Sequence, residues 1–278
     1  MNGKICVITG ANSGIGKDTA IGLAQKGAHI VMICRNPEKA RAAQQEIREK
    51  GQGARVDLLI ADLASKKQVR KVAAEFLSTY PRLDVLVNNA GLVQKQKQMT
   101  EDGIEVQWAT NHLAPFLLTS LLLDVLKKSA PARVVTVSSG GHWAGHINFS
   151  DIDSSKRFNM WLAYCNSKLA NILFARELAK RLEGTGVTSN ALHPGGVNTN
   201  FAGGQVPERL FGIARRFMIS SESGARTPVY LSSSPEVEGQ TGGYYVRCKP
   251  AWSRPESRNP DVMRRLWEVS EKMTGLTA

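Results

Sequence analysis

Residues 9–16 read TGANSGIG, and the placement of this stretch decides the fold. It directly follows an apolar run, KICVIT at residues 4–9, and it opens a stretch from Ile15 to Lys26 that reads as a helix. Glycines allow a tight turn and a close approach of the backbone to a ligand. A helix that begins at such a turn offers free N–H groups and the positive end of its dipole, which suit a dinucleotide pyrophosphate. The alternative is an ordinary connection between a strand and a helix, which needs no ligand.

The glycines of this turn are Gly10, Gly14 and Gly16, which are spaced more widely than in the usual G-x-G-x-x-G pattern. A glycine-rich string alone is weak evidence, but its position between a strand and a helix makes the prediction specific. The turn residues that we expect to contact the cofactor are Gly10, Asn12, Ser13, Gly14, Ile15 and Gly16.

The alternation of strand and helix continues along the chain. Buried strands are predicted at residues 4–9, 28–34, 55–61, 83–89 and 133–139, and a sixth within 188–195. Further helices are predicted at residues 37–50, 65–80 and 101–128, the last with a bend at Pro115. This order predicts an α/β fold: one Rossmann-type, doubly wound parallel sheet that is flanked by helices on both faces.

The domain organisation is expected to be simple. The chain shows no repeat, no low-complexity segment and no linker, so residues 1–278 are predicted to form a single domain. Residues 203–226 break the regular alternation and are predicted to form a flap over the substrate.

The composition excludes several classes of protein. Of 278 residues, 42% are hydrophobic and 22% are charged, as in ordinary globular proteins, and the formal net charge is +12. The Lys and Arg residues are spread over many segments without a nucleic-acid motif, so we expect no nucleic-acid partner. An attraction to acidic membrane lipids, giving weak association with a membrane surface, stays open.

The cysteines and the apolar segments indicate a location. Cys6, Cys34, Cys165 and Cys248 are far apart and form no CxxC pair, which favours a reducing compartment, so we predict that the protein is cytoplasmic. No signal peptide opens the sequence, and the longest apolar run, residues 113–128, is interrupted by a proline and an aspartate. We therefore expect no transmembrane anchor.

The end of the second predicted strand, ICRNPEK, indicates which dinucleotide binds. NAD-binding proteins carry an acidic residue here that holds the ribose hydroxyls. In this chain Cys34 replaces the acid and Arg35 follows, and a guanidinium can bind a 2′-phosphate. We therefore predict NADP(H), with Asn36 and Lys39 as further contacts. The alternative for Arg35 is a solvated residue beside a helix start.

Asp62 closes the third predicted strand and is a candidate partner for the adenine amino group, with Leu63 beside it. The alternative is that Asp62 caps the next helix. Ser65 is better placed for that role.

Six features follow one another along the sequence: TGANSGIG, NNAG at 88–91, Asn111, VSSGG at 137–141, Tyr164-x-x-x-Lys168 and HPGGVNT at 193–199. In this the chain resembles the short-chain dehydrogenase/reductase family over nearly its whole length. Two segments, residues 163–187 and 251–275, are most similar to the retinol-dehydrogenase-like branch. The resemblance implies an oxidoreductase.

The residue types fit that chemistry independently. Tyr164 and Lys168 are four residues apart, so on a helix they share one face. A free tyrosine titrates near pH 10, and an adjacent ammonium is expected to lower that pKa. Tyr164 is therefore the predicted acid in reduction and base in oxidation. Lys168 would tune it and, as the resemblance implies, also bind the nicotinamide ribose.

The resemblance implies further site residues. Ser139, rather than Ser138, would hydrogen-bond the substrate oxygen, and Asn111 would position a water in the proton relay, although it could equally make a structural bond to a bent helix. The remaining cofactor contacts that it implies are Asn89, Ala90, Gly91, Val137, Pro194, Gly195, Val197 and Thr199.

An insertion at residues 140–160 lengthens the spacing from Ser139 to Tyr164 to 25 residues. His142, Trp143 and Trp161, in and beside it, are predicted to wall an apolar substrate site. The alternative is that these aromatics only anchor the loop on the core. A helical spacing of His142 and His146 could bind a metal, but the loop composition argues against a helix, so no metal is predicted.

The predicted function is interconversion of an apolar alcohol and its aldehyde or ketone, retinoid-like or lipid-derived, with NADP(H). One alternative is a reductase of broad specificity for small or xenobiotic carbonyls. Another is an NADP-sensing regulator without catalysis. The chain is also expected to form a homodimer or homotetramer, because residues 112–126 are apolar over more than one helix face.

Overall fold

A computed structural model describes residues 1–195 and 220–276. These residues contain an eight-stranded sheet of order β3-β2-β1-β4-β5-β6-β7-β8. The strands are parallel except for the last, β8, which pairs antiparallel with β7. The bounds are β1 Ile5–Thr9, β2 His29–Cys34, β3 Val56–Ile60, β4 Val85–Asn88, β5 Ala132–Val137, β6 Val187–His193, β7 Tyr244–Val246 and β8 Lys249–Pro250.

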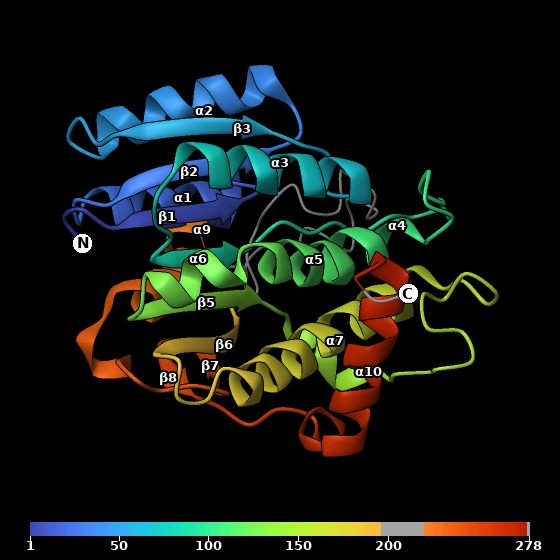
Figure 1. Cartoon of the computed structure of the whole chain (residues 1–278). Helices are drawn as coiled ribbons and strands as arrows, with labels where there is room; N and C mark the ends of the chain where they lie inside the picture. The colour runs from blue at the N-terminus through green and yellow to red at the C-terminus, as the bar shows by residue number, and fades with distance from the viewer. Residues whose placement is uncertain (196–219, 277–278) are drawn as a thin grey trace.

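Helices cover both faces of this sheet, which confirms the predicted doubly wound α/β fold. Figure 1 shows α3, α5 and α6 in front of the sheet and α1 and α9 behind it. The helix bounds are α1 Gly14–Ala24, α2 Pro37–Lys50, α3 Lys66–Thr79, α4 Val106–Trp108, α5 Ala114–Leu121, α6 Leu123–Lys128, α7 Met160–Arg181, α9 Ser221–Ser233 and α10 Pro260–Thr274.

Each strand contributes to two hydrophobic cores, because successive side chains point to opposite faces. On β2, Val31 and Ile33 pack into the core under α3, α5 and α7, while Ile30 and Met32 pack into the core under α1 and α2. Burial on both faces explains why the strands are apolar almost throughout.

The predicted helix over residues 101–128 is shorter and broken. It begins at Val106, where the Glu105 carboxylate caps α4 by accepting the N–H groups of Gln107 and Trp108. A π-turn, Ala109–Leu113, then separates α4 from α5, and a second break follows at Leu122. The predicted bend at Pro115 was wrong in detail: Pro115 sits in the first turn of α5, where its missing N–H costs nothing.

The C-terminal helix α10 covers part of the apolar surface of residues 112–126. The Trp267 ring lies 4.8 Å from the Phe116 ring of α5 and 6.0 Å from the Phe174 ring of α7, between centroids. Much of the surface that suggested an oligomer contact is therefore buried inside the chain.

The insertion runs through a short 3-10 turn, Gly140–Ala144, and an irregular loop to the start of α7. Of the predicted flap, residues 203–219 lie outside the described part, and residues 221–226 form the start of α9. Within the described ranges, no helix combines the length and the apolarity needed to cross a membrane.

Candidate active site

The glycine turn and the N-terminus of α1 form an open anion site at the carboxyl edge of the sheet. Figure 1 shows β1, β4 and β5 ending on this side, away from the N-terminus of the chain. Ser13 occupies the N-cap position of α1, but its side chain makes no capping bond, and the first turn holds no acidic residue. The first N–H groups of α1 therefore remain available to a phosphate.

Two glycines allow the close packing that this turn requires. Gly10 has φ 68°, in the left-handed region that other residues rarely adopt. A Cβ atom on Gly16 would lie 2.5 Å from the carbonyl oxygen of Gly10 and against Nδ2 of Asn89. The residues present thus form a cradle that larger side chains would fill, which fits a dinucleotide.

Thr9 joins this turn to the segment after β4. Its Oγ1 accepts the N–H groups of Asn89 and Ala90, both at 2.9 Å, and the Asn89 amide donates to the Thr9 carbonyl at 2.8 Å. The neighbouring Asn88 instead bonds Thr119 of α5 at 3.0 Å. These bonds place the predicted cofactor residues Asn89 and Ala90 beside Gly10.

The end of β2 carries an exposed positive charge. The Arg35 side chain is 69% exposed, and its Nη1 lies 3.9 Å from Oδ2 of Asp62 at the end of β3. Cys34 is buried in the position expected for an acid, and burial raises the pKa of its thiol to about 11. No carboxylate therefore takes the place of the missing acid at the end of β2 itself.

Other predicted residues near this end have structural partners. Asn36 caps α2 by accepting the N–H of Lys39 at 2.9 Å. Leu63 is buried in the core beneath α3. Asp62 accepts the N–H of Ala64 at 3.0 Å, whereas Ser65 caps α3, as the sequence indicated.

Ser139, Tyr164 and Lys168 come together where β5 meets α7. Ser139 lies just beyond β5 and hydrogen-bonds the Tyr164 side chain. Lys168, one turn further along α7, is 3% exposed, and its Nζ lies 5.7 Å from the centre of the Tyr164 ring. A hydroxyl, a phenol and an ammonium therefore converge from distant parts of the sequence.

Burial dominates the electrostatics of this cluster. It raises the pKa of Tyr164 to about 12, and the Ser139 hydrogen bond lowers that pKa by a smaller amount. Burial also lowers the pKa of Lys168 to about 8. In the cofactor-free chain burial therefore outweighs the groups that lower the pKa of Tyr164, and the net shift is opposite to the predicted one. The ammonium donates instead to the Val137 carbonyl at 3.2 Å.

Asn111 lies in the π-turn with its side-chain amide fully engaged. Its Oδ1 accepts the Leu92 N–H at 2.8 Å, and its Nδ2 donates to the Leu92 carbonyl and to Ser167 Oγ, both at 3.0 Å. A Cβ atom on Gly91 would stand 3.2 Å from Asn111 Oδ1 and from Lys168 Nζ. Asn111 and Gly91 therefore belong to the same cluster, and the structural bond that the sequence left open is present.

The two serines after β5 have different partners. Ser138 is buried and donates to the Lys168 carbonyl at 2.7 Å, which ties β5 to α7. Ser139 hydrogen-bonds the Tyr164 side chain. Val137 is a predicted cofactor residue. Its carbonyl oxygen accepts hydrogen bonds from Lys168 Nζ and from the Asn171 side-chain amide, both at 3.2 Å.

The segment after β6 approaches the cluster. His193 ends β6, and its Nδ1 accepts the Gly140 N–H at 3.1 Å, directly after Ser139. Pro194 and Gly195 follow, the latter with φ 101°. The predicted contacts Val197 and Thr199 lie outside the described residues.

The predicted substrate residues occupy two different environments. His142 is fully buried: its Nδ1 donates to the Ser139 carbonyl at 2.7 Å, and its Nε2 accepts the Arg254 N–H at 3.3 Å. Its place is behind Ser139, which does not fit a wall that faces substrate. Trp143 and Trp161 are 50% and 49% exposed beside the cluster, so neither merely anchors the loop in the core.

No group of three His, Cys, Asp or Glu side chains in residues 1–195 and 220–276 is arranged to hold a metal ion. His146, the second member of the histidine pair, lies 3.0 Å from the Glu256 carboxylate instead.

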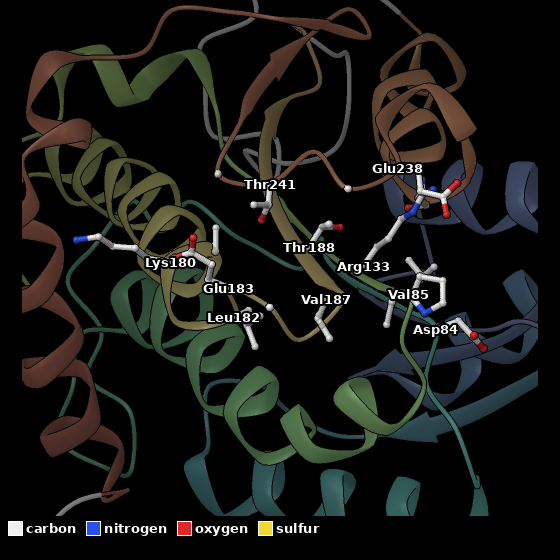
Figure 2. Close-up of a pocket in the computed structure, with 18 of the residues that line it drawn as sticks. Asp84, Val85, Arg133, Lys180, Leu182, Glu183, Val187, Thr188, Glu238 and Thr241 are labelled. Atoms are coloured by element: carbon white, nitrogen blue, oxygen red, sulfur yellow. The ribbon is translucent and has the colours of Figure 1, made fainter.

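A cavity of about 920 Å³ lies at the opposite, amino edge of the sheet, where β4, β5 and β6 begin. Figure 2 shows it with Val187 and Leu182 among its lining, Arg133 directed toward Glu238, and Lys180 pointing away. No predicted catalytic or cofactor residue lines it, so it is distinct from the cluster around Tyr164.

Sequence reasoning missed Thr9, Asn171 and His193, which hold the site together. Thr9 stands in the first motif, but its position on an apolar strand suggested only a buried residue. Their hydrogen-bond partners lie 34 to 81 residues away in the sequence, so no local pattern could reveal them.

Comparisons with known proteins place the chain among relatives of similar sequence and fold. Residues 4–209 match the family model described as short chain dehydrogenase. Human retinol dehydrogenase 14 is 46% identical over 294 residues, which cover 99% of this chain and 88% of that protein.

Two solved structures extend the comparison. An uncharacterized protein from Mycobacterium paratuberculosis has a TM-score of 0.80 and 34% identity, with 99% of this chain and 94% of that chain covered. A short chain dehydrogenase from Shigella flexneri 2a, complexed with NADP, has a TM-score of 0.71 and 25% identity, with 90% and 98% covered.

Proposed function

Because the chain belongs to the short-chain dehydrogenase/reductase family, in its retinol-dehydrogenase-like branch, we propose that it interconverts an apolar alcohol and its aldehyde or ketone with NADP(H). The family makes the chain an oxidoreductase that uses a nicotinamide cofactor. The observation that carries the finer proposal is the convergence of Ser139, Tyr164 and Lys168 beside the glycine turn.

When bound, NADPH supplies the hydride. Tyr164 holds the proton that the substrate oxygen needs as negative charge develops on it. With a pKa raised to about 12, the phenol is protonated at neutral pH and is ready to act as the acid in reduction. Ser139 donates a hydrogen bond to the same oxygen and orients it. Lys168 adds positive charge and would hold the nicotinamide ribose.

The choice of NADP(H) rests on Arg35 and on the missing acid at the end of β2. The Shigella relative was solved with NADP, which supports the proposal by similarity. An apolar, retinoid-like or lipid-derived substrate is supported by the relatives named retinol dehydrogenases and by Trp143 and Trp161 beside the cluster.

Two further proposals concern the setting of the enzyme. Its four cysteines are free thiols, which supports a reducing, cytoplasmic location. A homodimer or homotetramer is proposed from the family. The chain itself gives this proposal less support, because most apolar side chains of residues 112–126 are buried within the chain, in part under Trp267 of α10.

The experiment that tests the function compares wild type with Tyr164→Phe. Wild type is expected to reduce retinal or another apolar aldehyde with NADPH, and the variant to lose about 10²–10⁴-fold in kcat, because the proton donor is gone. NADPH binding, followed by fluorescence, should persist in the variant.

Cys165→Ala is the matched control, because Cys165 adjoins Tyr164 on α7 and carries no proposed chemistry. Turnover confined to small soluble carbonyls would favour the reductase of broad specificity. Wild-type inactivity across a broad panel of carbonyls, with NADPH still bound, would favour a regulator and end the proposal.

A further inference from the structure

The peptide bond between Ser139 and Gly140 is held by two histidines that come from different parts of the sequence. The Ser139 carbonyl accepts the Nδ1–H of His142 at 2.7 Å. The Gly140 N–H donates to Nδ1 of His193 at 3.1 Å. This peptide bond is trans, so its C=O and N–H point in opposite directions. The two imidazole rings therefore hold one peptide plane from opposite sides.

The hydrogen-bond partners fix which nitrogen of each ring carries the proton. A carbonyl oxygen only accepts, so Nδ1 of His142 is protonated and its Nε2 accepts the Arg254 N–H at 3.3 Å. The Tyr244 hydroxyl, 3.4 Å from the same Nδ1, is the more distant of the two neighbours of this nitrogen. A backbone N–H only donates, so Nδ1 of His193 carries no proton.

Both rings stay in these forms at neutral pH. Burial lowers the pKa of His142, and it lowers the pKa of His193 to about 4. Each ring is therefore neutral, so that His142 keeps its Nδ1 proton for the carbonyl and His193 keeps its Nδ1 lone pair for the N–H.

The fold supports both rings. His193 is the last residue of β6, and it pairs with Val246 of β7. His142 is fully buried, and its ring packs edge-on against the Tyr244 ring of β7, with 5.0 Å between the centroids. A Cβ atom on Gly140 would touch the His193 ring, 3.4 Å from its Nε2, so the glycine and the ring are close neighbours. Both histidines are thus fixed against the strands at this edge of the sheet.

The held peptide plane decides where the Ser139 hydroxyl points. The Gly141 N–H, which follows this plane, donates to Ser139 Oγ at 3.1 Å. Because Oγ accepts this bond from the backbone, its own O–H is left to donate. The bond between Ser139 and the Tyr164 side chain lowers the pKa of Tyr164, as a hydrogen bond donated to the phenolate does. A rotation of the Ser139–Gly140 plane would move the Gly141 N–H and release the hydroxyl.

We propose that His142 and His193 are positioning residues, which hold the Ser139–Gly140 peptide plane so that the Ser139 hydroxyl stays aimed at Tyr164 and at the substrate oxygen. This role rests on the proposed function, in which that hydroxyl orients the reacting carbonyl. Each histidine acts through the backbone of the serine rather than on the substrate. A misplacement of about 1 Å in such a group costs about 100-fold in rate, so the effect is expected in kcat.

The first test replaces the acceptor nitrogen of His193. His193→Leu has no acceptor, and it is expected to lower kcat for an apolar aldehyde by about 10- to 100-fold while changing KM by less than about threefold. His193→Asn places Oδ1 near the position of Nδ1, and it should keep kcat within about threefold of wild type. His146→Leu is the matched control, because it makes the same change at a 69% exposed histidine, and it should react as wild type does.

The second test repeats His193→Leu in a Ser139→Ala background. A residue that acts only through the Ser139 hydroxyl has little left to do once that hydroxyl is absent, so kcat is expected to fall by less than about twofold further. A ring that only supports the fold would lower kcat by the same factor in both backgrounds. Fluorescence titration with NADPH and urea unfolding of each protein report losses of cofactor binding and of stability separately.

Further variants keep the test open where His193→Leu does not fold. His193→Gln retains polarity but carries its oxygen one carbon further from the backbone, so it should lose the Gly140 bond and lower kcat as the leucine does. On the other side of the peptide plane, His142→Asn keeps an N–H donor for the Ser139 carbonyl, whereas His142→Leu has none. The asparagine variant is therefore expected to be the faster of the two.

The outcomes separate this proposal from the proposed function. An active wild type, with a His193→Leu variant that keeps more than half of its kcat, would overturn the positioning role and leave the proposed function intact. Equal losses in the two backgrounds, or His193→Asn as slow as His193→Leu, would also overturn it. Equal kcat values for His142→Asn and His142→Leu would remove His142 from the role. Wild-type inactivity across the panel of carbonyls would end the proposed function and this inference with it.

Discussion

Arg35 is the residue on which cofactor choice depends, because its exposed guanidinium stands where an acid would bind the ribose of NAD. Arg35→Ser is expected to weaken NADPH binding by about tenfold or more while leaving NADH binding unchanged, because only NADPH carries a 2′-phosphate. Fluorescence titration with each cofactor measures this. Arg41→Ser, on the exposed side of α2, is the control, and a tenfold preference of the wild type for NADH would refute the assignment.

Lys168 should make stability depend on pH in a defined window. Burial lowers its pKa in the folded chain to about 8, from 10.5 in an unfolded chain, so the buried charge is a penalty below pH 8. As pH rises from about 8 to 10.5 the folded chain releases the proton that the unfolded chain keeps. The free energy of unfolding therefore rises over this window, by at most about 3 kcal/mol.

The measurement is urea unfolding of the cofactor-free wild type and of Lys168→Met at several pH values. Subtracting the two curves removes the contributions of other tyrosines and cysteines. A difference that stays flat between pH 8 and 10 would contradict the buried position of the ammonium.

Tyr164 shows which property of a single residue could not be predicted from the sequence, namely the direction of its pKa shift. A helical spacing of four placed Tyr164 and Lys168 on one helix, and both lie on α7. Spacing could not show that burial outweighs the neighbouring ammonium, nor that Lys168 donates to the Val137 carbonyl. Desolvation depends on the packing of β5, α7 and the segment around Gly91, which is a tertiary property.

At the level of elements, the π-turn between α4 and α5 depends on Asn111. Asn111→Ala removes the partners of the Leu92 N–H and carbonyl, and is expected to lower the free energy of unfolding by about 2–4 kcal/mol. Urea denaturation measures the change. Thr110→Val is the control, because the buried Thr110 hydroxyl in the same turn has no hydrogen-bond partner among the described residues. Equal effects of both changes would exclude a special role for the amide.

The elements that were predicted correctly have strong local signals. The first six strands are apolar runs bounded by turns, and α2 has Pro37 at its start and Gly51 after its end. The short strands β7 and β8, with three and two residues, lack such a signal. No local pattern indicated the break at residues 109–113. The side-chain bonds of Asn111 within it run to Leu92 and Ser167, which are 19 and 56 residues away in the sequence.

At the scale of the whole molecule, α10 packs the C-terminal part of the chain against the central sheet's hydrophobic core, on the face covered by α3, α5 and α7. Trp267→Ala is expected to lower the free energy of unfolding by about 3–5 kcal/mol, because it leaves a cavity beside the contacting rings of Phe116 and Phe174. Far-UV circular dichroism and tryptophan fluorescence in urea should show one coincident transition in the wild type, as one domain requires.

Trp252→Ala is the control for this change, since the same residue type is removed from a 76% exposed position. It should cost about 1 kcal/mol or less. Two separate transitions in the wild type would contradict the single domain predicted for residues 1–278.

Thr9 has a consequence for anyone who would transplant this cofactor turn into another scaffold. Its single hydroxyl accepts two backbone N–H groups from the segment after β4, 80 and 81 positions downstream. Transferring residues 9–16 alone would leave Thr9 Oγ1 without its two donors. Transferring residues 88–91 alone would leave the N–H groups of Asn89 and Ala90 without this acceptor. A chimera that keeps this hydrogen-bonded turn must therefore contain both residues 9–16 and residues 88–91.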